Sequence, residues 1–204
     1  MDIRKYFPVF KAERDKEKEN KQDQTLEKSS IQYKKTIKVF TDGSTFNNGS
    51  KTKKQKGGLG IFFEDDHPNN KSIKLTEFPI TNNIAELKAC ITAIEIILET
   101  EIIPNKSFEI IIYTDSEYLI NSITKWAKLW KFNGWKKKEG TKFVDIKNKE
   151  LIITLYTLVS QHPIKFKHVK AHKSAPINKA SDAYKEWYGN YMADKLATKA
   201  SSEV

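Results

Sequence analysis

One pattern, present twice, constrains the fold of this chain more than any other feature. Residues 37–43 and 110–116 are both apolar runs that end in Thr-Asp and a small residue, with Asp42 and Asp115 at equivalent positions. Short apolar runs rich in β-branched residues predict buried strands. A carboxylate where a strand ends inside a core is costly unless a cation offsets its charge. The repeat therefore predicts a paired-carboxylate site that binds metal.

Composition narrows the class of protein. The 204 residues suffice for one domain with extensions, and 38% of them are hydrophobic. The single Cys90 lies in an apolar, helix-like stretch and is typical of a packed thiol in a reducing compartment. No run approaches the roughly 18 apolar residues of a membrane span, and the first residues resemble neither a signal nor a transit peptide. We therefore expect a soluble intracellular protein.

The formal net charge of +10 suggests the kind of partner. A basic domain that also carries clustered carboxylates is typical of proteins that bind a polyanion and cut it with metal ions. Charge alone fits a solvated Lys-rich surface equally well. The distribution of the basic residues has to separate these two interpretations.

Three regions follow from the changes in composition. Residues 11–30 alternate Lys with Glu and Asp and contain almost no apolar residues, so they cannot form a core. We interpret residues 11–35 as a charged linker and residues 36–204 as the catalytic domain. Residues 1–10 form a separate, more apolar segment.

Within the domain, hydrophobic periodicity predicts the elements. Apolar runs with turn signals between them predict an antiparallel meander of strands at 36–41, 57–63 and 71–78. A helix from Thr81-Asn82 to about residue 98 places Glu86 in its first turns. The remaining predicted elements are a strand at 108–114, helices at 117–121, 124–132 and 151–159, a strand at 164–169 and a closing helix at 183–200.

This order and its carboxylates resemble the type 1 ribonuclease H family over residues 36 to about 200. The four acidic positions of that family match Asp42 in TDGS, Glu86 in TNNIAEL, Asp115 in YTDS and Asp194 in GNYMAD. The resemblance implies an α/β, ribonuclease H-like fold. Its five-stranded mixed sheet would have three antiparallel strands, then parallel additions, flanked by helices.

Each acidic residue alone has an ordinary structural explanation. Asp-Gly is common in turns, Thr-Asp-Ser commonly caps a helix, and a Glu in a first helical turn complements the helix dipole. All four, in order and on the expected strands and helices, favour a catalytic site.

The resemblance also implies the metal chemistry. Phosphodiester hydrolysis by two metal ions about 4 Å apart needs carboxylates that bridge and flank them. By resemblance Asp42 would bridge both ions, Glu86 and Asp115 would hold one, and Asp194 the other. Oxygen ligands suit Mg²⁺, with Mn²⁺ as a possible substitute, and the absence of a Cys/His cluster argues against zinc.

His172 follows the last strand, where the family places a mobile-loop histidine implicated in leaving-group protonation or product release. The stretch from His172 to Asp194 is longer than usual for the family, and Ala175 replaces a glycine there. The alternative is an ordinary solvated loop histidine.

A second cluster points to the substrate. Residues 124–138 interleave three Trp with Lys, so that rings can pack on sugars or bases while ammonium groups contact phosphates. By resemblance, Tyr118 and Trp126 match an aromatic surface for the DNA strand, and Lys128 lies in a basic protrusion. The alternative for the rings is core packing, which we expect for Trp130.

Short amides suit contacts with the 2′-hydroxyls that distinguish RNA from DNA. By resemblance Asn82 and Asn83 read the RNA minor groove, and Asn47 is a further candidate. Thr81 and Asn148 match a pocket for a DNA phosphate, although Pro79 stands where eukaryotic relatives often have Arg. The alternative for each Asn is a helix cap or a turn.

The N-terminal segment places Ile3, Tyr6 and Phe7 at i, i+3 and i+4, so one helical turn would present all three to a pocket. This resembles the motif that binds the sliding clamp (PCNA), without its usual leading Gln. The alternative is an incidental apolar segment that packs on the domain or stays disordered.

These observations predict an endoribonuclease that hydrolyses the RNA strand of RNA–DNA hybrids and leaves 5′-phosphate and 3′-hydroxyl ends. We expect a monomer in the nucleus or cytoplasm, at sites of DNA replication. One alternative is a non-catalytic hybrid-binding or clamp-associated module, which the four carboxylates argue against. Another is a resolvase or transposase of the same fold, which the Trp-Lys cluster and the Asn pair disfavour.

Overall fold

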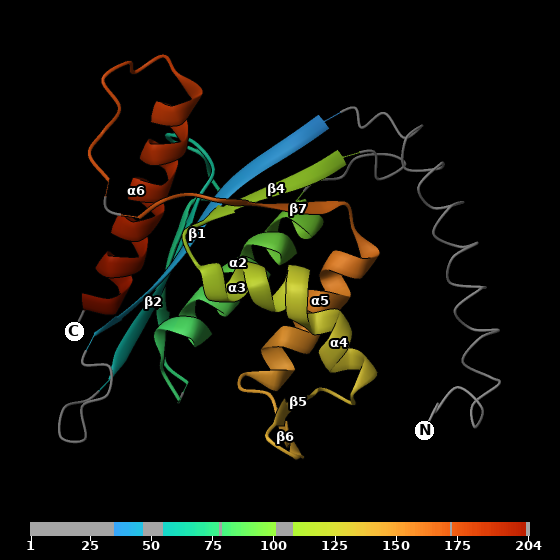
Figure 1. Cartoon of the computed structure of the whole chain (residues 1–204). Coiled ribbons are helices and arrows are strands. Elements are labelled where there is room, and N and C mark those ends of the chain that lie inside the picture. Colours follow the sequence, from blue (N-terminus) through green and yellow to red (C-terminus); the bar gives the residue numbers. More distant parts are fainter. Residues whose placement is uncertain (1–34, 47–54, 78, 101–107, 172, 203–204) are drawn as a thin grey trace. The chain divides into compact units, whose positions relative to one another are not determined.

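The computed structural model describes residues 35–46, 55–77, 79–100, 108–171 and 173–202 (Figure 1). They belong to one compact unit, Lys35–Val204. Several predicted features lie outside the described residues: the motif of Ile3, Tyr6 and Phe7, the linker up to residue 34, Asn47 and His172.

A five-stranded mixed sheet forms the centre of the unit, and the predicted fold class is confirmed. Its strand order is β3 (Lys71–Leu75), β2 (Lys56–Phe62), β1 (Lys35–Phe46), β4 (Phe108–Thr114) and β7 (Ile164–His168). β1, β2 and β3 pair antiparallel, whereas β4 and β7 are added parallel to β1.

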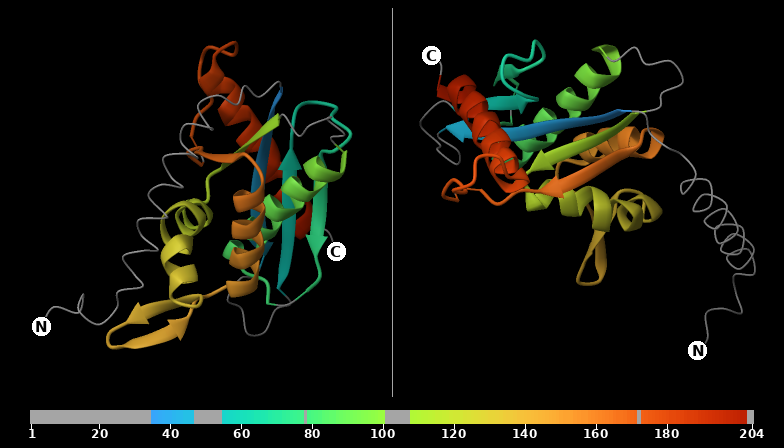
Figure 2. Two further views of the ribbon diagram at one scale, coloured as in Figure 1. Left: turned by 90° about the vertical axis from the view of Figure 1, so that its right-hand side faces the viewer. Right: turned by 90° about the horizontal axis from the view of Figure 1, so that it is seen from above.

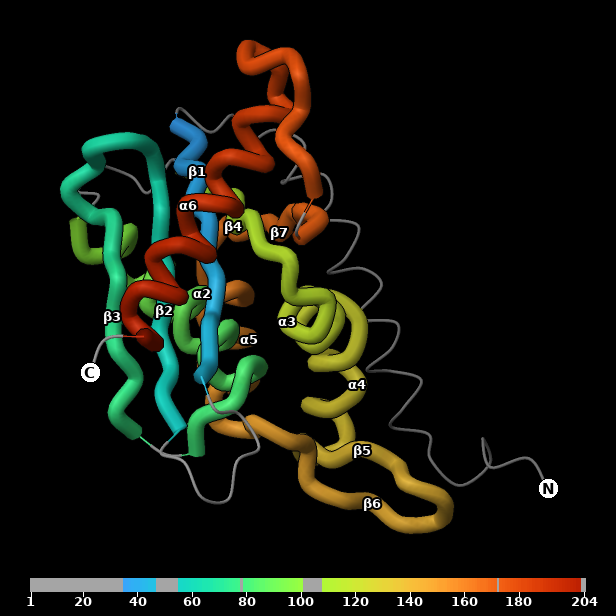
Figure 3. Tube along the Cα trace, turned by 90° about the vertical axis from the view of Figure 1, so that its left-hand side faces the viewer, coloured from blue at the N-terminus to red at the C-terminus, as the bar shows by residue number. Residues whose placement is uncertain are grey.

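Side-chain alternation divides the core between the two faces of the sheet. On one face, residues such as Val39, Ile61 and Ile110 pack with helices α2 (Asn82–Thr100) and α5 (Lys149–Gln161). On the other face, Phe40 and Tyr113 pack under α6 (Asp182–Ser202). Figure 3 shows α6 crossing β1 and β2. The sheet is therefore covered on both faces.

The segment after β4 is continuously helical rather than two separate helices as predicted. α3 (Glu117–Asn121) runs into a π-helical turn, η3 (Ser122–Trp126), and then into α4 (Ala127–Phe132). Trp130 packs half-buried against the main core, as expected. Cys90 is fully buried on α2, which agrees with its prediction as a packed thiol.

Two further details differ from the sequence-based prediction. The third strand ends at Leu75, which pairs with Gly57 of β2, instead of at residue 78. A hairpin of β5 (Lys136–Glu139) and β6 (Lys142–Asp145) was not predicted, because its Lys-rich strands lack apolar alternation. This hairpin projects away from the sheet (Figure 2). Among the described residues, no helix is both long and apolar enough to cross a membrane.

Candidate active site

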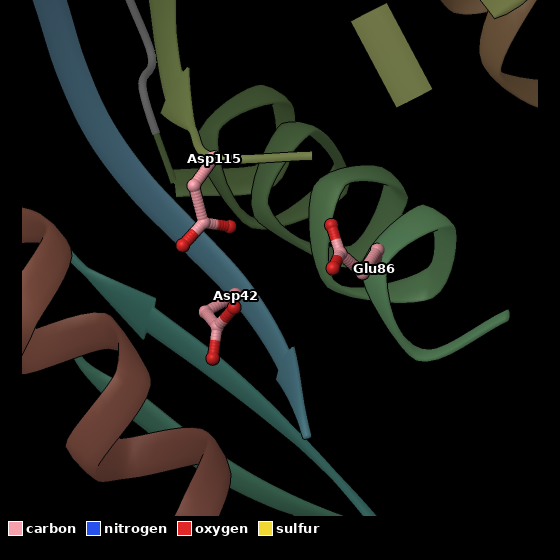
Figure 4. A group of neighbouring side chains, drawn as sticks. All are labelled: Asp42, Glu86 and Asp115. Atoms are coloured by element: carbon pink, nitrogen blue, oxygen red, sulfur yellow. The ribbon is translucent and has the colours of Figure 1, made fainter. Parts of the chain in front are cut away.

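Two parallel strands bring the repeated Asp residues together. Asp42 lies on β1 and is 8% exposed, and Asp115 directly follows Thr114 at the end of β4. Because β1 and β4 run parallel, with Phe40 opposite Tyr113, both carboxylates reach the same edge of the sheet (Figure 4). The His168 ring contacts the Asp115 carbonyl oxygen at 3.2 Å and links this turn to β7. The sequence repeat is thus a spatial pair.

A glycine on β1 allows Glu86 to join the pair. A Cβ atom on Gly43 would lie 2.3 Å from the backbone nitrogen of Glu86, closer than any side chain permits. The helix N-terminus therefore rests directly on the strand. Thr81 caps α2 by accepting a hydrogen bond from the Ile84 amide at 3.3 Å, which supports the predicted helix start.

The three carboxylates form a group with the geometry of a cation site. Asp42, Glu86 and Asp115 each offer one oxygen, and these oxygens all lie within 4.8 Å of one another. Figure 4 shows the three side chains around a common space. Oε2 of Glu86 is buried and has no hydrogen-bond partner among the described residues. An all-oxygen set with an unsatisfied buried oxygen fits a hard divalent cation such as Mg²⁺.

Asp194 approaches this group from the opposite face of the sheet. Asp42 pairs directly with Gly60 of β2. A Cβ atom on Gly60 would lie 1.9 Å from the carbonyl oxygen of Ala193, so the backbone of α6 packs onto the strand there. The next residue of α6 is Asp194, whose charge acts on Asp42. All four predicted carboxylates are thus brought to one edge of the sheet.

Without a bound cation, burial and mutual repulsion disfavour the charged form of these carboxylates. Burial raises the pKa of Asp42 to about 8, and the charges of Asp115, Glu86 and Asp194 add to this, against a backbone hydrogen bond from Gly43. Burial also raises the pKa of Glu86 to about 7, with Asp115 adding to it and a hydrogen bond to Ser116 opposing it. A bound cation reverses this repulsion.

The predictions from the sequence missed one residue of the site, Asn190. Its Nδ2 donates a hydrogen bond to Oδ2 of Asp115 at 3.3 Å, and its buried Oδ1 has no partner among the described residues. Asn190 lies four positions before Asp194, so both side chains lie on the same face of α6. That helical spacing was the available signal.

The predicted nucleic-acid contacts that the structure describes lie on several elements. Asn82 and Asn83 are exposed on the first turn of α2, where Thr45 hydrogen-bonds to Asn82. Nδ2 of Asn148 donates to the hydroxyl of Tyr118 at 3.0 Å, so those two predicted residues are paired.

The cluster at residues 124–138 is only partly exposed, because Trp130 and Trp135 pack half-buried against the core. Trp126 is 40% exposed and lies 5.5 Å from the ring of Trp130, centroid to centroid. Lys128 is exposed on the following turn, and Thr81 is half-buried at the cap of α2. None of these residues contributes to the carboxylate group itself.

Comparison with known proteins agrees with this arrangement. A model of the ribonuclease H family matches residues 34–202. A ribonuclease H of Schizosaccharomyces pombe is 35% identical over 165 residues, which are 81% of this chain and 53% of that protein. Ribonuclease HI of Haemophilus influenzae is 34% identical over 148 residues, which are 72% of this chain and 86% of that protein.

A solved structure supports the same assignment. The solution structure of the prototype foamy virus RNase H domain has a TM-score of 0.58 and 27% identity, covering 81% of this chain and 93% of that domain. This chain spans about half the length of the eukaryotic relatives it matches. Since the family model matches most of the chain, this chain belongs to the ribonuclease H family.

Proposed function

We propose that this chain is an endoribonuclease that hydrolyses the RNA strand of RNA–DNA hybrids and leaves 5′-phosphate and 3′-hydroxyl ends. The observation that carries the proposal is the group of three carboxylate oxygens within 4.8 Å of one another, on a ribonuclease H scaffold. Carboxylates grouped this closely suit metal-assisted phosphodiester hydrolysis. The basic net charge suits a polyanionic substrate.

The residues present fit two divalent ions, Mg²⁺ or Mn²⁺. Asp42 is the carboxylate on which the other three charges act, which suits the bridging position. Glu86 and Asp115 would hold one ion with it, and Asp194 the other. When bound, the ions activate water and stabilise the leaving oxygen. The chain itself orients these ligands through the close approach of α2 and α6 to the sheet.

We assign His172 a role at the leaving group or in product release. It follows β7 in the sequence and precedes α6, which carries Asp194. The imidazole is the side chain whose ordinary pKa suits proton transfer near neutral pH.

The hybrid would be held on both sides of the carboxylates. Asn82 and Asn83 are exposed one turn before Glu86, which suits contacts with 2′-hydroxyls of the cleaved strand. Tyr118, Trp126, Lys128 and the Asn148 amide suit the DNA strand, and Thr81 a DNA phosphate.

Cleavage of matched substrates tests the function. Labelled RNA–DNA hybrid, RNA duplex, DNA duplex and single-stranded RNA are incubated with the full chain in Mg²⁺ or EDTA, beside Asp115→Asn. We expect cutting of the hybrid alone, dependent on metal and lost in the variant. Hybrid binding without cutting in Mg²⁺ or Mn²⁺ would make the chain a binding module instead.

The N-terminal segment supports a second proposal, which concerns location. We propose that Ile3, Tyr6 and Phe7 bind the sliding clamp (PCNA) and place the enzyme, as a monomer, at sites of DNA replication in the nucleus or cytoplasm. Titration of purified clamp into the full chain tests this, with Tyr6→Ala/Phe7→Ala as the variant. Equal binding by both proteins, or by neither, would contradict it.

A further inference from the structure

A small cavity of about 230 Å³ opens beside the carboxylate site, against α6. It shares Asp115, Asn190 and Asp194 with that site. Its other lining residues are Lys170 and Lys173, which follow β7, and Trp187 and Tyr191 on α6. The cavity therefore adjoins the proposed metal site.

Two lysines give this cavity a positive side. Lys170 and Lys173 are exposed, and neither forms an ion pair with any other residue that the structure describes. A lysine that lines a polar cavity without an acidic partner is available to an anionic ligand. Asp115 and Asp194 on the other side would be neutralised by bound metal, so the net effect favours an anion.

A stack of side chains on α6 forms one wall of the cavity. The rings of Trp187 and Tyr191, one helical turn apart, lie 5.3 Å apart at 9°. Nζ of Lys195 lies 4.9 Å from the centre of the Tyr191 ring. Tyr191 is nevertheless 38% exposed, and neither ring belongs to the core under α6. Both rings therefore line the cavity rather than filling the interior.

The same stack fixes the loop that carries Lys173. Nε1 of Trp187 donates a hydrogen bond to the carbonyl oxygen of Lys173 at 2.8 Å. This bond spans fourteen residues and attaches the segment after β7 to α6. Trp187 thus holds the Lys173 backbone beside the cavity.

We propose that this cavity is a subsite for the ribose-phosphate of the cleaved strand, adjacent to the scissile phosphate. Lys170 and Lys173 contact its phosphate, and the rings of Trp187 and Tyr191 pack on its sugar. The strand is the cleaved one because Asp115 and Asp194 line both the cavity and the metal site. Most of the residues assigned to the DNA strand lie on α3, η3 and α4 and directly before α5, on the other side of β1 from α6 in Figure 1, and Thr81 lies directly before α2. This inference rests on the proposed function.

Binding measurements on the full chain test the subsite. An Asp42→Asn background prevents cutting without changing a cavity residue, and the variant adds Lys170→Gln and Lys173→Gln. The matched control is Lys199→Gln, a change of an exposed lysine in the last turn of α6. In the variant we expect the slope of log affinity against log salt to fall by about 0.9 for each lost phosphate contact. The control slope should stay unchanged.

A nested series of hybrids identifies the nucleotide. The RNA strand is shortened one nucleotide at a time from each end while the DNA strand is kept, and the reverse series shortens the DNA strand. In the Asp42→Asn protein, affinity should drop about tenfold at the single RNA nucleotide that occupies the cavity. The drop should vanish in the double lysine variant. An equal drop in affinity in the Asp42→Asn protein and in the double lysine variant would overturn the subsite. So would a drop seen only when the DNA strand is shortened.

A third variant separates a lost contact from a lost fold. Trp187→Phe keeps a ring in the stack but removes the donor to the Lys173 carbonyl. We expect the drop in affinity at the RNA nucleotide in the cavity to become about threefold smaller, while the melting temperature stays unchanged. A drop of unchanged size would contradict the role of the loop. Failure of the proposed function would look different, because the unmodified chain would then not cut the hybrid at all.

Discussion

Asn190 donates a hydrogen bond to the carboxylate of Asp115 across 75 positions of sequence, from helix α6 to the end of strand β4. This bond joins α6 to the carboxylate group at the end of β4. Because Asn190 is 7% exposed, its amide is held in place by the surrounding core. We interpret Asn190 as a positioning residue for Asp115.

Asn190→Ala should therefore weaken metal binding before it affects the fold. Loss of a hydrogen bond to a metal ligand typically costs 10- to 100-fold in metal affinity or activity. The Mg²⁺ concentration for half-maximal cleavage should rise by about that factor. Asn190→Asp should change this Mg²⁺ concentration by a different amount, because the substitution adds a negative charge beside Asp115. A melting curve provides the structural control, and an unchanged Mg²⁺ dependence in both variants would exclude the positioning role.

Asp42→Asn should stabilise the metal-free protein near neutral pH. The pKa of Asp42 is raised from 3.8 to about 8, chiefly by burial. Below pH 3.8 the carboxyl is protonated in both the folded and unfolded states. As the pH rises to about 8, the unfolded state releases this proton more readily, so the folded state loses stability until the folded pKa is passed.

Thermal denaturation in EDTA at pH 5 and pH 8 measures this effect. At pH 8 we expect Asp42→Asn to unfold roughly 4–8 °C above the wild type, a gain of about 2 kcal/mol in free energy of unfolding. The difference should shrink at pH 5. Added Mg²⁺ should stabilise the wild type much more than the variant. Equal stability of the two proteins in EDTA at both pH values would show that the buried Asp42 carboxylate does not destabilise the folded state.

Gly60→Ala should destabilise the protein far more than its size suggests. The new methyl group would lie 1.9 Å from the carbonyl oxygen of Ala193, a backbone atom that cannot rotate away. Overpacking of this kind costs about 1–3 kcal/mol or more. Lys74→Ala on the exposed part of β3 is the control and should change stability by less than about 0.5 kcal/mol. Urea denaturation of both variants provides the comparison.

The pair of Tyr118 and Asn148 should act as a unit in substrate binding. Asn148 has φ of 56°, so Asn148→Gly preserves the backbone and removes only the amide that donates to Tyr118. In a cycle of Tyr118→Phe, Asn148→Gly and the double variant, hybrid affinity should fall in each single variant by about fivefold. The double variant should fall little further. Fully additive losses would indicate that the two side chains bind independently.

The positions of the strands and the carboxylate pair were accessible from the sequence for a physical reason, whereas the parallel additions to the sheet were expected only from the family resemblance. An apolar run predicts a buried strand, and an Asp at the end of such a run is unusual. Asp42 and Asp115 are therefore recognisable in the sequence. Glu86 and Asp194 were found through family resemblance, because an acidic residue on a helix is ordinary by itself. The hairpin β5–β6 carries no apolar alternation and was missed.

Contacts that depend on tertiary packing were beyond the sequence. Asn190 looks like any polar helical residue until α6 is placed against β4. The bond between Trp187 and the Lys173 carbonyl depends on the path of the loop before α6. Gly58 and Gly60 in the run Gly57-Gly58-Leu59-Gly60 did carry a signal, since closely spaced glycines in a strand indicate close backbone approach.

The close contacts at Gly43 and Gly60 have a consequence for how this site tolerates change. Each glycine places the backbone of a helix directly on the sheet, α2 on one face and α6 on the other. The separation between the carboxylates is thus set by main-chain contact, with no intervening side chain to vary. Extensive replacement of apolar residues elsewhere in the core would leave the ligand geometry unchanged. Catalytic capacity and core sequence can therefore diverge independently in relatives that keep these two glycines.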